Sequence, residues 1–163
     1  MSQYTWEFQQ LNTVNYGFAD ALHDILVILN LGCPDSRSWY LENEDDLFEK
    51  VASHDSRLHL KFWNKPVDNL VNGGIADQYI DYRHPEDVRS LIHNIFTDQE
   101  HLNALTEAKV ASYLEKAYDL SQPSNLASKL TANEVAAAGI TVLPSIIIDD
   151  QLQAEQTSVL ANL

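Results

Sequence analysis

The chain has 163 residues, of which 45% are hydrophobic and 21% charged, a composition typical of one folded globular domain. The chain has ten Lys and Arg residues and 24 Asp and Glu residues. Its formal net charge of −14 argues against phosphate backbones and anionic lipid surfaces as partners. The single cysteine excludes an internal disulfide and fits a reducing compartment, and the first residues lack the basic region and apolar core of a signal peptide, so we expect a cytoplasmic protein.

The first 24 residues carry the weakest pattern in the chain. Tyr4, Trp6 and Phe8 alternate with polar residues, which indicates a short strand. The segment 15–17 has the composition of a turn, and 18–23 is interpreted as a helical turn. No apolar run anywhere in the chain is long enough to predict a membrane span.

A buried strand is predicted over 25–31, where an apolar run leads into Cys33 and Pro34. Apolar residues at helical spacing then predict a helix from 34 to about 52. Proline suits the first helical position because its missing N–H would have no partner there. The sulfur of Cys33 would therefore sit at a helix N-terminus, whose free N–H groups and dipole stabilise negative charge. This placement predicts a reactive thiol, and the alternative is a buried, inert cysteine.

Three neighbours of Cys33 would influence the charge on its sulfur. Arg37 would stabilise a thiolate and Asp35 would oppose it. Ser36 could donate a hydrogen bond to the sulfur. The balance of these groups indicates a thiol of moderate reactivity.

The middle of the chain predicts one further strand and then a helical block. Leu58, Leu60 and Phe62 alternate with His59, Lys61 and Trp63, which indicates a strand with one face firmly buried. The segment 72–74, with two glycines, is interpreted as a loop. Helices are predicted over 85–96 and over 98–120, the second with a break near 106. A last helix is predicted over 125–138, with a restart at the capping-box pair Thr131 and Glu134 and an end at Gly139.

The end of the chain predicts a strand and a hairpin. Pro144 stands immediately before a β-branched run, a position at which a proline opens a strand without losing a needed donor. We expect a strand over 145–148, a hairpin up to 156 and at most two helical turns in 157–163. The six histidines show no i, i+4 pair and no HExxH motif, so we predict no metal site.

The chain resembles the thioredoxin fold in the order of its elements. A strand is followed by Cys33-Pro34 and a helix and, much later, by the segment 139–145, in which Pro144 precedes an apolar strand. The helical block inserted at about 67–138 resembles its DsbA-like branch in particular, so the resemblance implies one α/β domain over 1–163, a mixed sheet flanked by helices. It also implies that the Leu143–Pro144 bond is cis and lies beside Cys33. Catalysis would then involve Cys33, Pro34, Ser36 and Pro144, with Leu143, Asp35 and Arg37 contacting substrate.

The departure from the family motif, Cys-x-x-Cys, limits the chemistry. The second position is Ser36, whose oxygen cannot form a disulfide, so dithiol oxidase chemistry is excluded. One hypothesis is a monothiol oxidoreductase without a bound cofactor, in which a protein thiol or glutathione resolves the mixed disulfide; kappa-class glutathione transferases have a similar scaffold.

The other hypothesis is a non-catalytic module that binds a protein partner through an exposed groove near Cys33. The segments 31–34 and 39–42 are similar to those of Clp-protease adaptor proteins of Gram-positive bacteria. These adaptors resemble DsbA-like domains adapted to bind another protein, and the second cysteine of their motif is missing here.

Overall fold

A computed structural model describes residues 4–154, 156, 160 and 163. Its centre is a five-stranded mixed sheet in the order β1-β3-β2-β4-β5. The strands are β1 (Val14–Tyr16), β2 (His23–Leu29), β3 (Ser56–Phe62), β4 (Ser145–Ile148) and β5 (Gln151–Leu152). β2 and β3 are parallel, whereas β1 pairs antiparallel with β3 and β4 antiparallel with β2.

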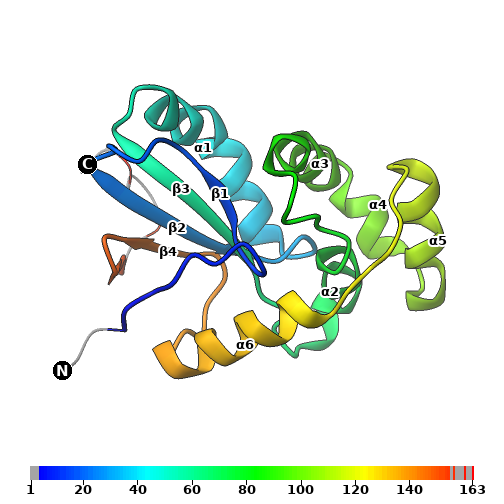
Figure 1. The fold of residues 1–163 in the computed structure, drawn as a ribbon. Helices are drawn as coiled ribbons and strands as arrows, with labels where there is room; N and C mark the ends of the chain where they lie inside the picture. The colour runs from blue at the N-terminus through cyan, green and yellow to red at the C-terminus, as the bar shows by residue number, and fades with distance from the viewer. Residues whose placement is uncertain (1–3, 155, 157–159, 161–162) are drawn as a thin grey trace.

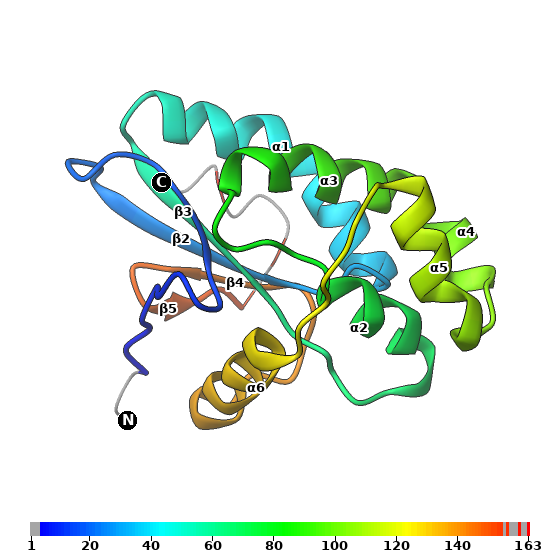
Figure 2. The same ribbon diagram turned by 45° about the vertical axis from the view of Figure 1, so that its right-hand side comes forward.

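Helices cover both faces of the sheet and extend beyond one of its ends (Figure 1). Figure 2 shows α1 and α3 side by side above the sheet and α6 beneath it, with α2, α4 and α5 grouped beyond the end at which β2 runs into α1. The helices are α1 (Pro34–Ala52), the short 3₁₀ helix η1 (Asp68–Leu70), α2 (Val71–Asp77), α3 (Pro85–Thr97), α4 (Gln99–Ala104), α5 (Glu107–Ala117) and α6 (Leu126–Ala138).

Alternation along β2 produces two hydrophobic cores. Ile25, Val27 and Leu29 face the core between the sheet and the helices α1 and α3. Leu26 and Ile28 face the core between the sheet and α6. Both faces are therefore buried, which explains why this strand is a continuous apolar run. The strand ends at Leu29, two residues before the expected end, because the chain turns at Asn30 to lead into α1.

The polar face of β3 is covered as well as the apolar face. His59 and Lys61 are 4% and 0% exposed, and Trp63, just after the strand, is 9% exposed. The polar groups of His59 and Lys61 both have partners: His59 bonds to Asp24, and the ammonium of Lys61 lies 2.8 Å from the carboxylate of Glu134 on α6. The predicted buried face is confirmed, and the burial of the second face was not predicted because alternation of apolar and polar residues does not reveal a buried ion pair.

The predictions for the first 24 residues were wrong. Residues 4–8 form no strand, although Trp6 is buried beneath α6 together with the second core. β1 occupies 14–16 and overlaps the turn expected at 15–17, and the segment 18–23, expected to be a helical turn, contains turns and the start of β2 but no helix. β1 exists because its residues pair with Leu58, His59 and Leu60 of β3, a contact that local sequence does not encode.

The connection between β3 and β4 is helical, as predicted, with two differences. The expected loop at 72–74 is inside α2, and α6 runs without a restart from Leu126 to Ala138. Thr131 and Glu134 do not form a capping box; both accept hydrogen bonds from the buried amide of Asn12. Gly139 ends α6 as expected, with a left-handed φ of 74° that favours glycine.

The last part of the chain agrees with the expectation for 145–152. β4 and β5 form the hairpin, and Asp149 and Asp150 both have positive φ in the turn between them. Gln156 and Leu160 are described, but most of 157–163 lies outside the described residues, and with it the two helical turns expected there.

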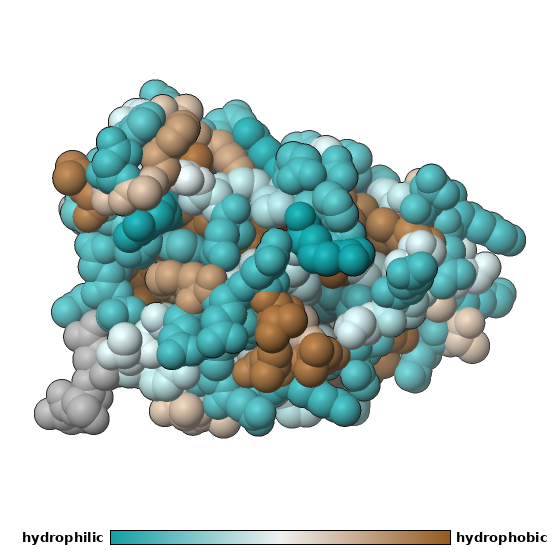
Figure 3. Space-filling model, in the orientation of Figure 1, coloured by the Kyte–Doolittle hydropathy of each residue, from teal (hydrophilic) through white to brown (hydrophobic). Residues whose placement is uncertain are grey.

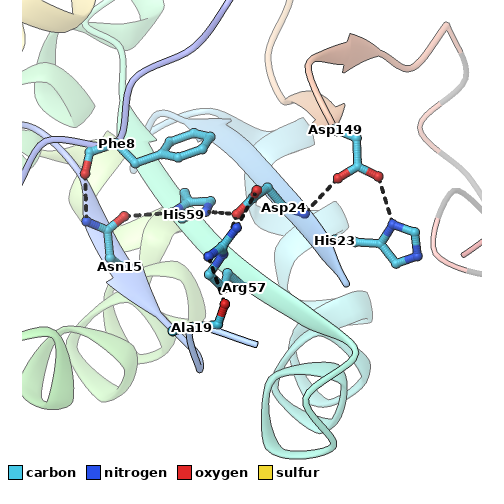
Figure 4. A network of polar contacts seen from close by, with 8 residues as sticks. All are labelled: Phe8, Asn15, Ala19, His23, Asp24, Arg57, His59 and Asp149. Atoms are coloured by element: carbon cyan, nitrogen blue, oxygen red, sulfur yellow. Dashed lines mark hydrogen bonds and ion pairs between the residues drawn. The ribbon is translucent and has the colours of Figure 1, made fainter. Parts of the chain in front are cut away.

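A polar network closes the end of the sheet at which β2 begins (Figure 4). Asp24 forms a two-fold ion pair with Arg57, at 2.7 and 2.9 Å, and accepts a hydrogen bond from His59. The other ring nitrogen of His59 contacts Asn15, and Phe8 stacks on the ring at 3.6 Å. This network ties the N-terminal segment to β2 and β3 at the end of β2 opposite the Cys33 turn.

Candidate thiol site

Cys33 is the N-cap residue of α1, as the sequence predicted. Its backbone is extended, with φ −82° and ψ 120°, and Pro34 occupies the first helical turn. The sulfur accepts a hydrogen bond from the peptide N–H of Ser36 at 3.4 Å. The thiol is therefore held at the positive end of a 19-residue helix, where negative charge on sulfur is favoured.

Ser36 occupies a different environment from the one we expected. It is 0% exposed, and its hydroxyl oxygen accepts a hydrogen bond from the peptide N–H of Asn30 at 3.3 Å. The donor to the sulfur of Cys33 is thus the main chain of Ser36, and the hydroxyl is used to fix the preceding loop. Ser36 anchors the turn from inside.

The 143–145 loop lies at the same end of the sheet as Cys33. Ser145 pairs with Ile28 near the end of β2, so the antiparallel register brings the start of β4 next to the Cys33 turn. The Leu143–Pro144 peptide bond is cis. Leu143 and Cys33 belong to the same apolar cluster, and each is 8% exposed.

The expected charged neighbours lie further out. Asp35 is exposed in the first turn of α1. A guanidinium nitrogen of Arg37 lies 3.9 Å from a carboxylate oxygen of Glu100, whose side chain is 93% exposed, so this pair is weak. The structure therefore brings Cys33, Ser36 and Leu143 together and leaves Pro34 and Asp35 on the surface.

Asn30, which local patterns did not single out, organises the loop before Cys33. Its side chain accepts a hydrogen bond from the N–H of Gly32 at 2.8 Å and donates to the carbonyl of Trp63 at 3.0 Å, and its own carbonyl accepts from the N–H of Cys33. A polar residue that ends a buried apolar run is the signal that could have identified it. Asn30 is 0% exposed, so it must form these bonds.

The helical insertion contacts the same loop from the other side. The carboxyl of Asp77 accepts a hydrogen bond from the N–H of Leu31 at 3.0 Å, and burial raises the pKa of this carboxyl well above its usual range. Gly73 on α2 lies directly against Gly32: a Cβ built on Gly73 would stand 2.3 Å from the nitrogen of Gly32. No predicted site residue revealed these contacts, because they join segments more than 40 residues apart.

A polar groove of about 430 Å³ opens beside Gly32 and Pro34. Its other walls come from the insertion and include Asp68, Asn69 and Asn72. Among the described residues no group of three His, Cys, Asp or Glu side chains could hold a metal ion, and none of the described helices is long and apolar enough to cross a bilayer. The site offers one thiol, main-chain polar groups and amide side chains.

The fold has relatives among known proteins. A family model described as thioredoxin matches residues 9–160. The chain belongs to this thioredoxin family. No curated protein matches this thioredoxin-family chain.

This member of the thioredoxin family shares its fold with solved structures that include proteins of DsbA type. A conserved protein of unknown function from Enterococcus faecalis V583 superposes with a TM-score of 0.83 at 29% identity, covering 89% of this chain and 83% of that one. Oxidised BdbD from Bacillus subtilis gives 0.65 at 10% identity, with 88% and 85% covered. MdbA, a thiol-disulfide oxidoreductase from Corynebacterium diphtheriae, gives 0.63 at 10% identity, with 90% and 84% covered.

Proposed function

We propose that this protein carries out thiol–disulfide exchange with a single cysteine, Cys33, and that an external thiol completes the cycle. The observation that carries the proposal is the sulfur of Cys33 at the N-terminus of α1, 3.4 Å from the N–H of Ser36, in a thioredoxin-family fold. The buried Ser36 replaces a resolving cysteine, so the second thiol must come from another molecule.

The chemistry needs two exchange steps. The thiolate of Cys33 attacks one sulfur of a disulfide, a Cys33 mixed disulfide forms, and the other sulfur leaves as a thiolate that takes up a proton. A second thiolate, from glutathione or a protein thiol, then attacks the sulfur bound to Cys33, forms a new disulfide with it and releases Cys33 in its reduced form. The cycle uses no metal or bound cofactor, and a compartment rich in reduced thiols, such as the cytoplasm, would supply the second thiol.

Reduction of a peptide–glutathione mixed disulfide, with glutathione as second substrate, tests the proposal. We expect turnover by the wild type and none by Cys33→Ser. Ser36→Cys should create a dithiol that also reduces insulin disulfides. If neither the wild type nor Ser36→Cys reacts, Cys33 is a packed structural residue and the proposal is wrong.

A second candidate is a module that binds another protein without catalysis. Cys33 is only 8% exposed, and two exposed valines, Val71 and Val142, adjoin Leu70 and Leu143 of its apolar cluster. Exposed apolar side chains next to a buried apolar cluster suit the apolar centre of an interface with a polypeptide partner. A wild type that is silent with glutathione while Ser36→Cys is active would favour this binding role.

A further inference from the structure

All the main-chain polar groups of Leu31, Gly32 and Cys33 have hydrogen-bond partners, and most of these partners are side chains. The N–H groups are bound by Asp77 and by Asn30. The three carbonyls point to α4, one of the inserted helices. The side-chain amide of Asn103 donates to the carbonyl of Gly32 at 2.9 Å.

Gln99, the first residue of α4, makes the central contact. Its side-chain nitrogen donates to the carbonyl of Leu31 at 2.9 Å and to the carbonyl of Cys33 at 3.0 Å. One NH₂ group thus uses both of its hydrogens on the two carbonyls that flank Gly32. Gln99 is 2% exposed, so water cannot replace it, and its loss would leave the carbonyl of Leu31 without this donor inside the protein.

The carbonyl of Cys33 has a second role that makes this contact relevant to the thiol. It accepts the first main-chain hydrogen bond of α1, from the N–H of Arg37 at 3.0 Å. Gln99 therefore fixes the orientation of the peptide group at which α1 starts, and with it the position of the sulfur relative to the N–H of Ser36.

We propose that Gln99 is a positioning residue for Cys33, which sets the reactivity of that thiol by holding the carbonyls of Leu31 and Cys33 from inside the helical insertion. This inference rests on the proposed function, since it assigns a role to the insertion in the chemistry of Cys33. Gln99 touches neither the sulfur nor a substrate in this role; it acts through the main chain of the turn.

The rate of Cys33 alkylation by iodoacetamide, measured on the full chain, tests the inference. Gln99→Met keeps a similar size and removes both donors. We expect its alkylation rate at neutral pH to fall at least about ten-fold, because a displacement near 1 Å of a reacting group can cost roughly 100-fold. Thermal unfolding of each variant shows that it is folded.

Asn12→Leu provides the matched control. Asn12 is also a buried amide whose nitrogen donates two hydrogen bonds, to Thr131 and Glu134, but it does not touch the Cys33 turn. It should lose stability and keep the wild-type alkylation rate. An equal rate change in Asn12→Leu and Gln99→Met would overturn the inference, since general loosening would then explain both.

Gln99→Glu tests the positioning role through the pH dependence of the alkylation rate, which a purely structural role would not change. Its carboxylate would repel the two carbonyls at neutral pH, whereas its protonated carboxyl can donate to one of them. We expect the alkylation rate of Gln99→Glu, divided by that of the wild type at the same pH, to rise towards one as the pH falls through the pKa of the introduced carboxyl, which burial raises above the ordinary Glu value of about 4.3. A ratio that does not change with pH would contradict the inference.

Two further results separate this inference from the proposed function. If Gln99→Met does not fold, Asn103→Ala, which removes one bond to Gly32 from an exposed residue, should lower the rate by a smaller factor. An unchanged rate there overturns the inference. If the wild type shows no turnover with glutathione but Gln99→Met still slows alkylation, the proposed function fails and the positioning role stands.

Discussion

Asp77 is an acidic side chain that is almost completely buried. It is 2% exposed, one carboxyl oxygen accepts the N–H of Leu31, and the other has no hydrogen-bond partner among the described residues. Burial raises the pKa of the carboxyl well above its usual range, and the bond from Leu31 lowers it by less. Asp77 therefore keeps its proton at pH values at which exposed aspartates have lost theirs.

This raised pKa predicts a stability that falls as the pH rises. Above about pH 4 the unfolded chain releases the proton of Asp77 while the folded chain keeps it, so the free energy of unfolding decreases until the folded-state pKa is passed. Asp77→Asn keeps an acceptor for Leu31 and cannot ionise. Urea unfolding at pH 4.5 and 7.5 should show Asp77→Asn gaining stability relative to the wild type at the higher pH.

Asp46→Asn on the exposed side of α1 is the control for this comparison. It should show almost the same pH dependence as the wild type. A difference between Asp77→Asn and the wild type that does not depend on pH would mean that Asp77 is ionised across the whole range.

At the scale of elements, the two glycines of α2 show how closely the insertion packs on the thiol turn. A Cβ on Gly73 would lie 2.1 Å from the side-chain oxygen of Asn30, whereas one on Gly74 would come no closer than 3.4 Å to Asn64. Both residues are buried inside the same helix. Only Gly73 needs to be glycine for steric reasons.

Alanine at these adjacent positions should therefore have opposite effects. Gly73→Ala forces α2 away from Asn30 and Gly32, and overpacking of this kind typically costs about 1–3 kcal/mol. Gly74→Ala should be neutral or stabilise by up to about 1 kcal/mol, because alanine favours a helix interior. Chemical unfolding of the two variants measures both effects. Equal destabilisation by both would show that the turn does not depend on this close approach.

The same helix marks the limit of prediction from local sequence. Cys33, Pro34 and the strand after Pro144 were found because their signals are local: an apolar run, a proline at a helix start, a proline at a strand start. Two glycines carry no local signal for a helix, and α2 forms because Gly73 allows contact with a loop about 40 residues away.

The partners of the thiol turn were missed for a related reason. Gln99 and Asp77 lie on helices whose own patterns do not mark them, and their importance comes from carbonyl and N–H groups of Leu31 that tertiary structure brings to them. Burial of Lys61 was likewise hidden, because its partner Glu134 is 73 residues away.

At the scale of the whole molecule, charge is the dominant property of the surface. The formal net charge is −14, and several of the ten Lys and Arg side chains are already paired with carboxylates. Figure 3 shows one face as largely hydrophilic, with a hydrophobic spot over the start of α6, where Leu126 is 52% exposed. Unbalanced negative charge on a folded chain repels itself and reduces stability.

Salt should therefore stabilise this protein. Raising the ionic strength from 10 to 150 mM shortens the range of the repulsion to roughly 8 Å, and a gain of about 1 kcal/mol would raise the melting temperature by about 2–4 °C. Differential scanning calorimetry in sodium chloride measures the shift, and potassium chloride at equal ionic strength should give the same value. A melting temperature that falls with salt would show that attractive ion pairs outweigh the repulsion.

The order of strands also bears on self-association. The sheet ends in β1, which has three residues, and in β5, which has two, whereas the seven-residue strands β2 and β3 lie inside it. An exposed strand edge offers unpaired N–H and C=O groups on which another chain can add, and short edges offer few of them. The most aggregation-prone runs, 25–29 and 146–148, both form interior strands. The native sheet is thus a poor template for amyloid-like growth, and fibril formation would require that β1 or β5 first detach.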